Sequence, residues 1–345
     1  MSELSAVTET FSSKQSERPT QMREIAIEVR GLVKTYGGSV RALDGLSFRV
    51  EAGTVFGLLG PNGAGKSTTV KILTTLSRPD GGAACVAGFD VLKSPGRVRL
   101  AIGCVAQRPG VDTEATGREN LVLQGRVYGL SGPELRRRVF GLLERFGLSE
   151  AADRVARTYS GGMQRKLDVA MGLIHRPEVL FLDEPTAGLD PEARADMWKE
   201  ITRLAHDEGI TILLTTHYLE EADRLAQQLA IVDRGKIVAE GSPEELKRGL
   251  RGDTIHFELA RSEEIEQAHD VLARMEELRE LVKEARWLHA RADHGASTVP
   301  VALAALESQG VKVASVTVAR PSLDDVYLRY AGRAFREADE GGANK

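Results

Sequence analysis

The chain has 345 residues, enough for about two domains with a buried core. Its formal net charge of -4 gives no electrostatic reason to expect nucleic acid as the main partner. No apolar run approaches the ~18 residues of a membrane span, and no signal-type segment begins the chain, so we expect a protein that is soluble or held at a membrane by another component. Cys85 and Cys104 both lie in apolar sequence, which favours core residues in a reducing compartment over a disulfide or metal pair.

The first 23 residues are rich in Ser, Thr, Glu and Gln and contain few apolar side chains, which predicts a disordered tail at residues 1–23. Strand-like segments follow at residues 25–29 and 43–50, with a Gly-Gly turn signal between them. Tyr36 directly precedes that turn, where an ordinary strand-end tyrosine would also lie.

The most specific motif is residues 60–68, which have the spacing GxxxxGK[ST]. It directly follows the apolar run of residues 55–59, which predicts a buried strand, and a helix is expected over residues 67–76. Glycines let such a loop turn tightly around an anion, and the helix N-terminus adds its positive end. The lysine can reach the β- and γ-phosphates, and the hydroxyl after it can ligate Mg²⁺. The sequence therefore predicts a nucleoside triphosphate site formed by Gly60, Pro61, Asn62, Gly63, Ala64, Gly65, Lys66, Ser67 and Thr68.

Three later apolar runs, at residues 101–106, 179–182 and 211–216, are typical of strands that end in polar side chains. The C-terminal ends of parallel strands face the ligand in α/β sheets, so we expect these side chains beside the phosphate loop. Asp183 suits the Mg²⁺ ion, directly or through water, and Glu184 suits the attacking water. Taken singly, each also fits a structural role, as a solvated strand end or a core histidine. The polar residues are Gln107, Asp183, Glu184 and His217.

The chain becomes helical in character from about residue 114 to 175. A helix over residues 132–146 carries apolar side chains at helical spacing. The arginine run at residues 136–138 is either a nucleic-acid patch or a solvated helix face, and the negative net charge favours the solvated face. The Ser-Gly-Gly sequence at residues 160–162 begins another helix, either as an anion site or as a simple N-cap, and Asp190 also fits an N-cap.

In this order and spacing the motifs resemble those of nucleotide-binding subunits of ATP-binding cassette (ABC) transporters, over residues 24–246. The resemblance implies an α/β P-loop cassette with a mixed sheet core and a helical subdomain at about residues 108–175, and ATP and Mg²⁺ as ligands. It also implies that Tyr36 stacks on adenine and that Asp190 makes a dimer contact. Catalytic roles are implied for Lys66, Glu184 and His217, phosphate contact for Ser160, Gly161 and Gly162, and Mg²⁺ contact for Ser67, Gln107 and Asp183.

Two sequence features indicate which type of ABC subunit the chain resembles. The family signature usually has Leu before and Gln after Ser-Gly-Gly, whereas this chain has Tyr159 and Met163. Together with the Pro-Ser-Leu-Asp-Asp-Val-Tyr sequence at residues 321–327, this variant is similar to the daunorubicin/doxorubicin-resistance type of ABC subunit.

Residues 253–331 predict a small C-terminal α+β domain, followed by a flexible tail at residues 332–345. A regulatory or dimer-supporting role is the default for this domain, because it has no metal-ligand cluster and no nucleophile with a matching base; a drug-sensing pocket is the alternative. Its predicted strands are residues 254–259, 287–290 and 311–318, and its predicted helices are residues 265–278 and 299–306.

The function implied by the resemblance is that of an ATPase which couples hydrolysis to transport. Two copies would enclose two ATP molecules at the cytoplasmic face of the cell membrane, peripherally bound to a separate membrane-spanning permease, with no nucleic acid partner. The signature variant favours export of an antibiotic or other hydrophobic drug. Export of lipid or polysaccharide stays open, as does a soluble ABC ATPase that acts on ribosomes or DNA. Proteins of that last kind usually have two cassettes or a long coiled-coil insertion, and this chain has neither.

Overall fold

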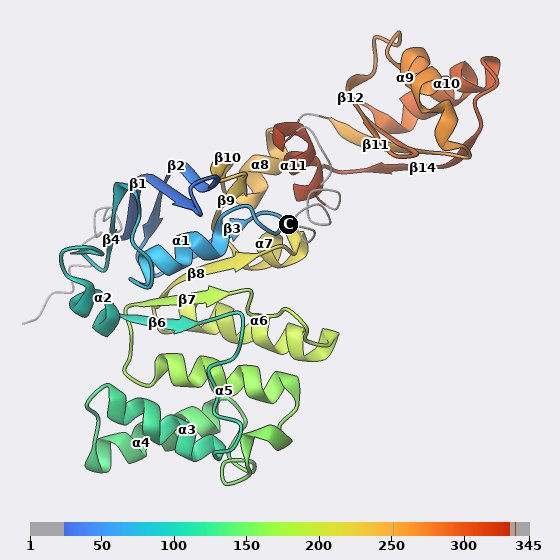
Figure 1. Ribbon diagram of the computed structural model, residues 1–345. Coiled ribbons are helices and arrows are strands. Elements are labelled where there is room, and N and C mark those ends of the chain that lie inside the picture. The colour runs from blue at the N-terminus through green and yellow to red at the C-terminus, as the bar shows by residue number, and fades with distance from the viewer. Residues whose placement is uncertain (1–23, 251, 332–334, 336–345) are drawn as a thin grey trace, which may run out of the picture.

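The computed structural model describes residues 24–250, 252–331 and 335 (Figure 1). The tail expected at residues 1–23 lies outside the described residues, as does the tail expected at residues 332–345 except for Phe335. Within the described ranges, none of the helices combines the length and the apolar character needed to cross a membrane.

The centre of the molecule is a mixed six-stranded sheet. Its strands are β3 (Val55–Leu59), β6 (Ile102–Val105), β7 (Val179–Asp183), β8 (Thr211–Thr216), β9 (Gln228–Asp233) and β10 (Lys236–Gly241). Their order is β10-β9-β3-β8-β7-β6, and all pairs are parallel except β9 with β10. Every residue of β3, β7 and β8 is buried, as the continuous apolar runs predict for strands covered on both faces.

A second, antiparallel sheet covers one side of this core. It consists of β1 (Ile25–Tyr36), β2 (Val40–Glu51), β4 (Gly81–Val86) and β5 (Phe89–Asp90) in the order β2-β1-β4-β5. β1 and β2 are longer than the segments predicted from the sequence, so Tyr36 is the last residue of a strand. The helix α1 (Lys66–Leu73) begins at the phosphate loop and packs between the two sheets, and α2 (Pro95–Ala101) leads into β6.

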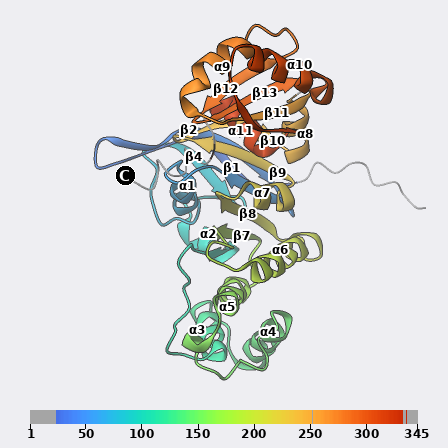
Figure 2. The ribbon, with the colours of Figure 1, turned by 90° about the vertical axis from the view of Figure 1, so that its right-hand side faces the viewer.

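Helices form a layer on the other side of the central sheet (Figures 1 and 2). They are α3 (Gly117–Val127), α4 (Gly132–Arg145), the short η1 (Ala156–Thr158), α5 (Gly161–Leu173), α6 (Pro191–His206), α7 (Leu219–Leu225) and α8 (Pro243–Arg248). α5 lies between the sheet and the pair α3 and α4, which are the helices of this layer furthest from the sheet. α4 buries Leu135, Val139 and Leu143 on one face, as its apolar spacing predicts.

The C-terminal unit is a separate antiparallel sheet with two helices on one face. Its elements are β11 (Asp253–Leu259), η2 (Ser262–Glu264), α9 (Ile265–Leu272), β12 (Arg279–Glu284), β13 (Trp287–Ala292), α10 (Gly295–Ser308) and β14 (Val313–Ala319). The strand order β12-β13-β11-β14 and the βαββαβ chain order are those of a ferredoxin-like fold. Both views place it at the end of the molecule opposite α3 and α4.

The sequence analysis missed the strand β12. It extended one helix to Leu278, whereas α9 ends at Leu272 and Leu278 enters the same core from the turn that follows. The sequence Arg-Glu-Leu-Val-Lys-Glu of β12 has little apolar content because β12 is an edge strand. The predicted α/β cassette with a mixed sheet, a helical layer and a small C-terminal α+β unit is confirmed.

The last described helix, α11 (Leu323–Ala331), packs back onto the cassette. Ser322 and Asp325 cap its first turn: Ser322 N donates to Asp325 Oδ2 at 2.7 Å, and Asp325 N donates to Ser322 Oγ at 3.2 Å. Tyr327 is fully buried in a core that also contains Leu59 of β3, and its hydroxyl donates to Asp233 Oδ1 at 3.1 Å. The sequence motif at residues 321–327 is therefore the cap and the buried face of a docking helix.

Candidate functional site

The phosphate-loop motif forms the connection between β3 and α1. Gly60 N donates to Thr216 O at 3.3 Å, which fixes the start of the loop to the end of β8. A Cβ atom on Gly60 would lie 2.3 Å from Val232 O, and one on Gly65 would lie 2.6 Å from Ala42 O. Gly65 also has φ +114°, where side chains are strained. Packing therefore requires glycine at both positions, and the backbone conformation requires it at Gly65 as well.

Lys66, the first residue of α1, is buried with 4 % of its surface exposed. Its Nζ donates to Gly60 O at 2.6 Å and to Pro61 O at 3.1 Å, and lies 3.7 Å from Glu184 Oε1. The ammonium group is thus held inside the loop by two carbonyl oxygens and faces a carboxylate.

Asp183 ends β7 and its carboxylate faces the start of α1. Its Oδ1 accepts hydrogen bonds from Thr215 Oγ1 at 2.5 Å and from Ser67 Oγ at 3.3 Å. Hard divalent cations prefer such oxygen ligands, so the Ser67 hydroxyl and the Asp183 carboxylate fit a Mg²⁺ ion. Gln107 does not join them in this arrangement, because its Nε2 donates to Glu184 Oε2 at 3.0 Å.

Glu184 is the centre of a group of four side chains, the Glu184 cluster, which also contains Lys66, Gln107 and His217. His217 Nδ1 lies 3.2 Å from Glu184 Oε1. Burial by itself would raise the pKa of Glu184, but the nearby His217, Lys66 and Gln107 outweigh it and hold the pKa below its usual value. The carboxylate is therefore ionised and able to accept a proton at neutral pH.

The backbone of Glu184 allows both carboxylates to reach the same site. Neighbouring side chains on a strand point to opposite faces, so a strand that continued through Glu184 would place Asp183 and Glu184 on different sides. The strand ends at Asp183, and Glu184 has φ +50°. Its N–H donates to Thr215 O and to Thr215 Oγ1, both at 3.1 Å. This turn directs the Glu184 side chain toward Lys66.

Ser160 and Asp190 lie outside the Glu184 cluster, at the N-termini of two neighbouring helices. Ser160 Oγ accepts from Met163 N at 3.3 Å as the N-cap of α5, and Asp190 Oδ1 accepts from two N–H groups as the N-cap of α6. The two helix ends touch closely, since a Cβ atom on Gly162 would lie 2.9 Å from the Cβ of Ala193. The residues predicted for phosphate and dimer contacts thus form a second patch on the same chain.

Tyr36 is at the exposed end of β1, where 40 % of its surface is accessible. Lys34 Nζ lies 5.4 Å from the centre of its ring. β1 pairs with β2, and β2 contacts the phosphate loop through Ala42 and Gly65. The tyrosine is therefore carried by a hairpin that packs on the loop.

The two signature residues that differ from the usual family sequence have clear structural roles. The hydroxyl of Tyr159 is buried and donates to Ala151 O at 2.6 Å. A Cβ atom on Gly117 would lie 2.3 Å from that hydroxyl, so glycine at this position makes room for the tyrosine. Met163 is half-buried against the core of the helical layer. Both residues anchor the start of α5.

The sequence analysis missed Arg165, which lies in α5 and is only 5 % exposed. Its guanidinium donates to the backbone oxygens of Asp183 and Glu184, both at 3.1 Å, and also pairs with Asp168 Oδ2 at 3.2 Å. It further donates to Ala106 O at 2.6 Å and to Pro185 O at 2.8 Å. Arg165 therefore joins the signature helix to the segments that carry Gln107, Asp183 and Glu184. Its sequence signal, one cation in an apolar helix, does not reveal these partners.

Comparison with protein families assigns two parts of the chain. The family described as "ABC transporter" matches residues 43–187, and the family described as "ATP-binding protein DrrA1-3-like, C-terminal domain" matches residues 241–331. Among solved structures, "Structure of ATP binding subunit of ABC transporter" is 31% identical with a TM-score of 0.59 and covers 65% of this chain and 92% of that one. CbiO1 from Clostridium perfringens, part of the ABC transporter complex cbiONQ, is 27% identical with a TM-score of 0.61 and covers 72% of this chain and 96% of that one.

Curated relatives match nearly the whole chain. The daunorubicin/doxorubicin resistance ATP-binding protein DrrA of Streptomyces peucetius is 45% identical, over 91% of this chain and 96% of that protein. The doxorubicin resistance ATP-binding protein DrrA of Mycobacterium tuberculosis is 43% identical, over 88% of this chain and 93% of that protein. The Nod factor export ATP-binding protein I of Ralstonia nicotianae is 40% identical, over 90% of this chain and 95% of that protein.

Proposed function

This chain belongs to the family of ATP-binding proteins of ABC transporters, and we propose that it is the energy-coupling ATPase subunit of an exporter of an antibiotic or other hydrophobic drug. The proposed ATPase activity rests on one observation, the buried and ionised Glu184 beside Lys66, Gln107 and His217. The drug-export part is supported by relatives named for daunorubicin and doxorubicin resistance.

In this proposal the phosphate loop binds the triphosphate of ATP. The N–H groups at the start of α1 and the Lys66 ammonium face the phosphates, and Lys66 exchanges its two carbonyl contacts for phosphate oxygens. Ser67 and Asp183 would hold Mg²⁺, which would supply positive charge against the phosphates. Tyr36, at the end of the hairpin that packs on the loop, stacks on the adenine.

Glu184 orients and deprotonates the water that attacks the γ-phosphate. Gln107 donates to one carboxylate oxygen at 3.0 Å, so the other oxygen is the one directed at the water. For Gln107 to contact Mg²⁺, its side-chain amide would have to turn away from Glu184. His217 lies beside the same carboxylate and contacts the γ-phosphate. Phosphoryl transfer needs mainly positioning and charge stabilisation, which this set of residues can supply.

The proposed active unit is a homodimer. ABC ATPase cassettes work as dimers with membrane permease components, and the positions of Ser160 and Asp190 outside the Glu184 cluster suit contact with a second copy. Ser160, Gly161 and Gly162 of one copy would cover the γ-phosphate bound to the other. We place this dimer at the cytoplasmic face of the cell membrane, peripherally bound to a separate membrane-spanning permease.

Affinity capture from native membranes tests the proposal. Tagged Glu184→Gln protein with ATP is expected to capture a polytopic membrane protein, and Lys66→Ala protein is expected to capture less of it. Recovery of ribosomal proteins or DNA, with no membrane protein, would instead indicate a soluble ABC ATPase.

A second substrate class is favoured by one observation. The relative named for Nod factor export is 40% identical, nearly as similar as those named for drug resistance. Deleting the gene for this chain should increase cellular accumulation of daunorubicin or a related drug if the substrate is a drug. If the deletion leaves accumulation of every such drug unchanged and abolishes export of a lipid or polysaccharide, the substrate is that lipid or polysaccharide.

A further inference from the structure

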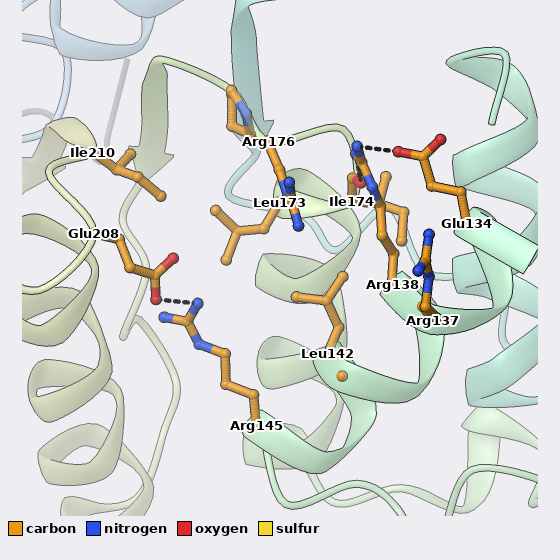
Figure 3. A pocket seen from close by; sticks show the side chains of 12 residues that line it. Glu134, Arg137, Arg138, Leu142, Arg145, Leu173, Ile174, Arg176, Glu208 and Ile210 are labelled. Carbon is orange, nitrogen blue, oxygen red and sulfur yellow. Dashed lines mark hydrogen bonds and ion pairs between the residues drawn. The ribbon is translucent and has the colours of Figure 1, made fainter. Parts of the chain in front are cut away.

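A cavity of about 830 Å³ lies on the side of the molecule away from the Glu184 cluster (Figure 3). Its walls are α4, the connection from α5 into β7, and the connection from α6 into β8. Both connections enter their strands at the N-terminal ends, whereas Asp183, Glu184 and His217 follow the C-terminal ends. We call it the arginine cavity, because Arg137, Arg138, Arg145 and Arg176 line it together with only two acidic residues, Glu134 and Glu208.

The two acidic residues are already neutralised. Arg138 Nη2 donates to Glu134 Oε1 at 2.7 Å, and its Nη1 donates to Ile174 O at 2.8 Å. Arg145 pairs with Glu208 and, at 2.6 Å, with Glu200. Figure 3 shows both pairs on the cavity wall.

Arg137 and Arg176 supply the uncompensated charge. Within the part of the chain that the structure describes, neither arginine has an ion pair or hydrogen bond from its side chain, and both are exposed. They come from different elements, α4 and the connection into β7, and line the same cavity. Two guanidinium groups without an acidic partner suit an anionic group that can accept hydrogen bonds from both, such as a phosphate.

The floor of the cavity is apolar. Leu173, Ile174 and Ile210 are buried there, and half-buried Leu142 of α4 also lines the cavity. A Cβ atom on Gly141 would meet no atom within 4 Å, so the α4 wall is open at this point. A volume of this size accommodates a small organic molecule, and an apolar floor favours a ligand with a hydrocarbon part.

We propose that the arginine cavity binds an organic phosphate monoester, with its phosphate between Arg137 and Arg176 and its apolar part over Leu142. A phosphate monoester carries about two charges near neutral pH, and the guanidinium fork matches its oxygens in a bidentate manner. The ligand bridges α4 to the central sheet. It is either a free metabolite or the headgroup of a lipid, since the recognised chemistry is the same. The proposal does not depend on the transport function.

Titration calorimetry of the full chain with hexyl phosphate tests the site. Arg137→Ala with Arg176→Ala should weaken binding at least about tenfold, since two charge-assisted contacts are removed. Arg126→Ala with Arg136→Ala is the matched control, because it removes the same charge from exposed positions outside the cavity and should change affinity less than about twofold. Unchanged melting temperatures in both double variants establish that folding is intact.

Further titrations separate this site from the phosphate loop and test the role of the apolar floor. Lys66→Ala should leave hexyl phosphate affinity unchanged, and inorganic phosphate should bind more weakly than hexyl phosphate. The proposal is contradicted if the cavity and control variants lose hexyl phosphate affinity equally. It is also contradicted if hexyl phosphate and inorganic phosphate bind with equal affinity.

Vesicle flotation distinguishes the two sources of ligand. The ligand is a lipid headgroup if the protein floats with vesicles of phosphatidylcholine plus phosphatidic acid but not with vesicles of phosphatidylcholine alone. This flotation should then be lost when Arg137→Ala is combined with Arg176→Ala. Saturable hexyl phosphate binding without flotation assigns a free metabolite. Absence of both overturns the proposal.

Discussion

Lys66 has a buried ammonium group whose neighbours are two loop carbonyls and a carboxylate. A buried cation is stable only when its donors are used, and the loop oxygens of Gly60 and Pro61 accept two of them. A triphosphate offers stronger, charged acceptors in the same place. We therefore propose that Lys66 exchanges these carbonyl contacts for phosphate oxygens when nucleotide binds.

Lys66→Ala should weaken ATP binding about tenfold or more, because a charge-assisted contact to phosphate is removed. Equilibrium titration with a fluorescent ATP analogue measures this. Lys71→Ala is the control, since Lys71 lies on the same helix and is exposed. Unchanged affinity in Lys66→Ala would refute the assignment of the phosphate loop.

Arg165 gives a prediction about stability. Replacing it with Met leaves four carbonyl oxygens without their guanidinium donor, together with the buried carboxylate of Asp168. Breaking a buried charged pair costs about 3–5 kcal/mol, so the melting temperature should fall by several degrees. Lys166→Met, at the next and more exposed position, should have a much smaller effect. Equal melting temperatures for the two variants would show that the Arg165 contacts contribute little.

At the scale of elements, the sequence was most informative where periodicity and motif coincide. The buried strand β3 was predicted as the apolar run that precedes the phosphate loop, and β7 and β8 were predicted as apolar runs that end in polar residues. α4 was predicted because its apolar side chains recur at helical spacing. Parallel strands align their C-terminal ends, so a correct strand assignment was enough to bring Lys66, Glu184 and His217 together.

Other features depend on tertiary contacts that no local pattern reveals. The left-handed turn at Glu184 is fixed by Thr215 of the neighbouring strand. The arginine run of α4 was expected to be a solvated face, but Arg138 caps the end of α5 and lines a cavity. The edge strand β12 lacks an apolar run and was left unassigned between a predicted helix and a predicted strand. For Glu184 and Arg138 the deciding partner is distant in the sequence.

At the scale of the whole molecule, α11 makes the C-terminal unit and the cassette interdependent. The chain leaves the cassette at β11, completes the antiparallel sheet, and returns to pack α11 against α7, α8 and β10. Val326 and Tyr327 share a buried core with Leu59, which directly precedes the phosphate loop. A cavity of about 280 Å³ lies between α11 and the C-terminal sheet. A drug-sensing pocket in this unit therefore stays a hypothesis.

Tyr327→Ala should destabilise the full chain by about 3–5 kcal/mol, because a fully buried aromatic side chain is removed from that core. Thermal unfolding measures the change. Tyr330→Ala on the same helix is the control, since Tyr330 is 49% exposed and its loss should cost about 0.5 kcal/mol or less. If both variants unfold at the wild-type temperature, α11 does not support the cassette.

Catalytic turnover tests the central claim most directly, because it needs the phosphate loop, the Glu184 cluster and a second copy at once. Steady-state ATP hydrolysis by Glu184→Gln should fall at least about 100-fold, with ATP affinity retained, since the general base is lost while the phosphate contacts stay. Glu220→Gln, an exposed glutamate on α7, should hydrolyse ATP at the wild-type rate. Near-normal hydrolysis by Glu184→Gln would contradict the account and remove Glu184 from catalysis.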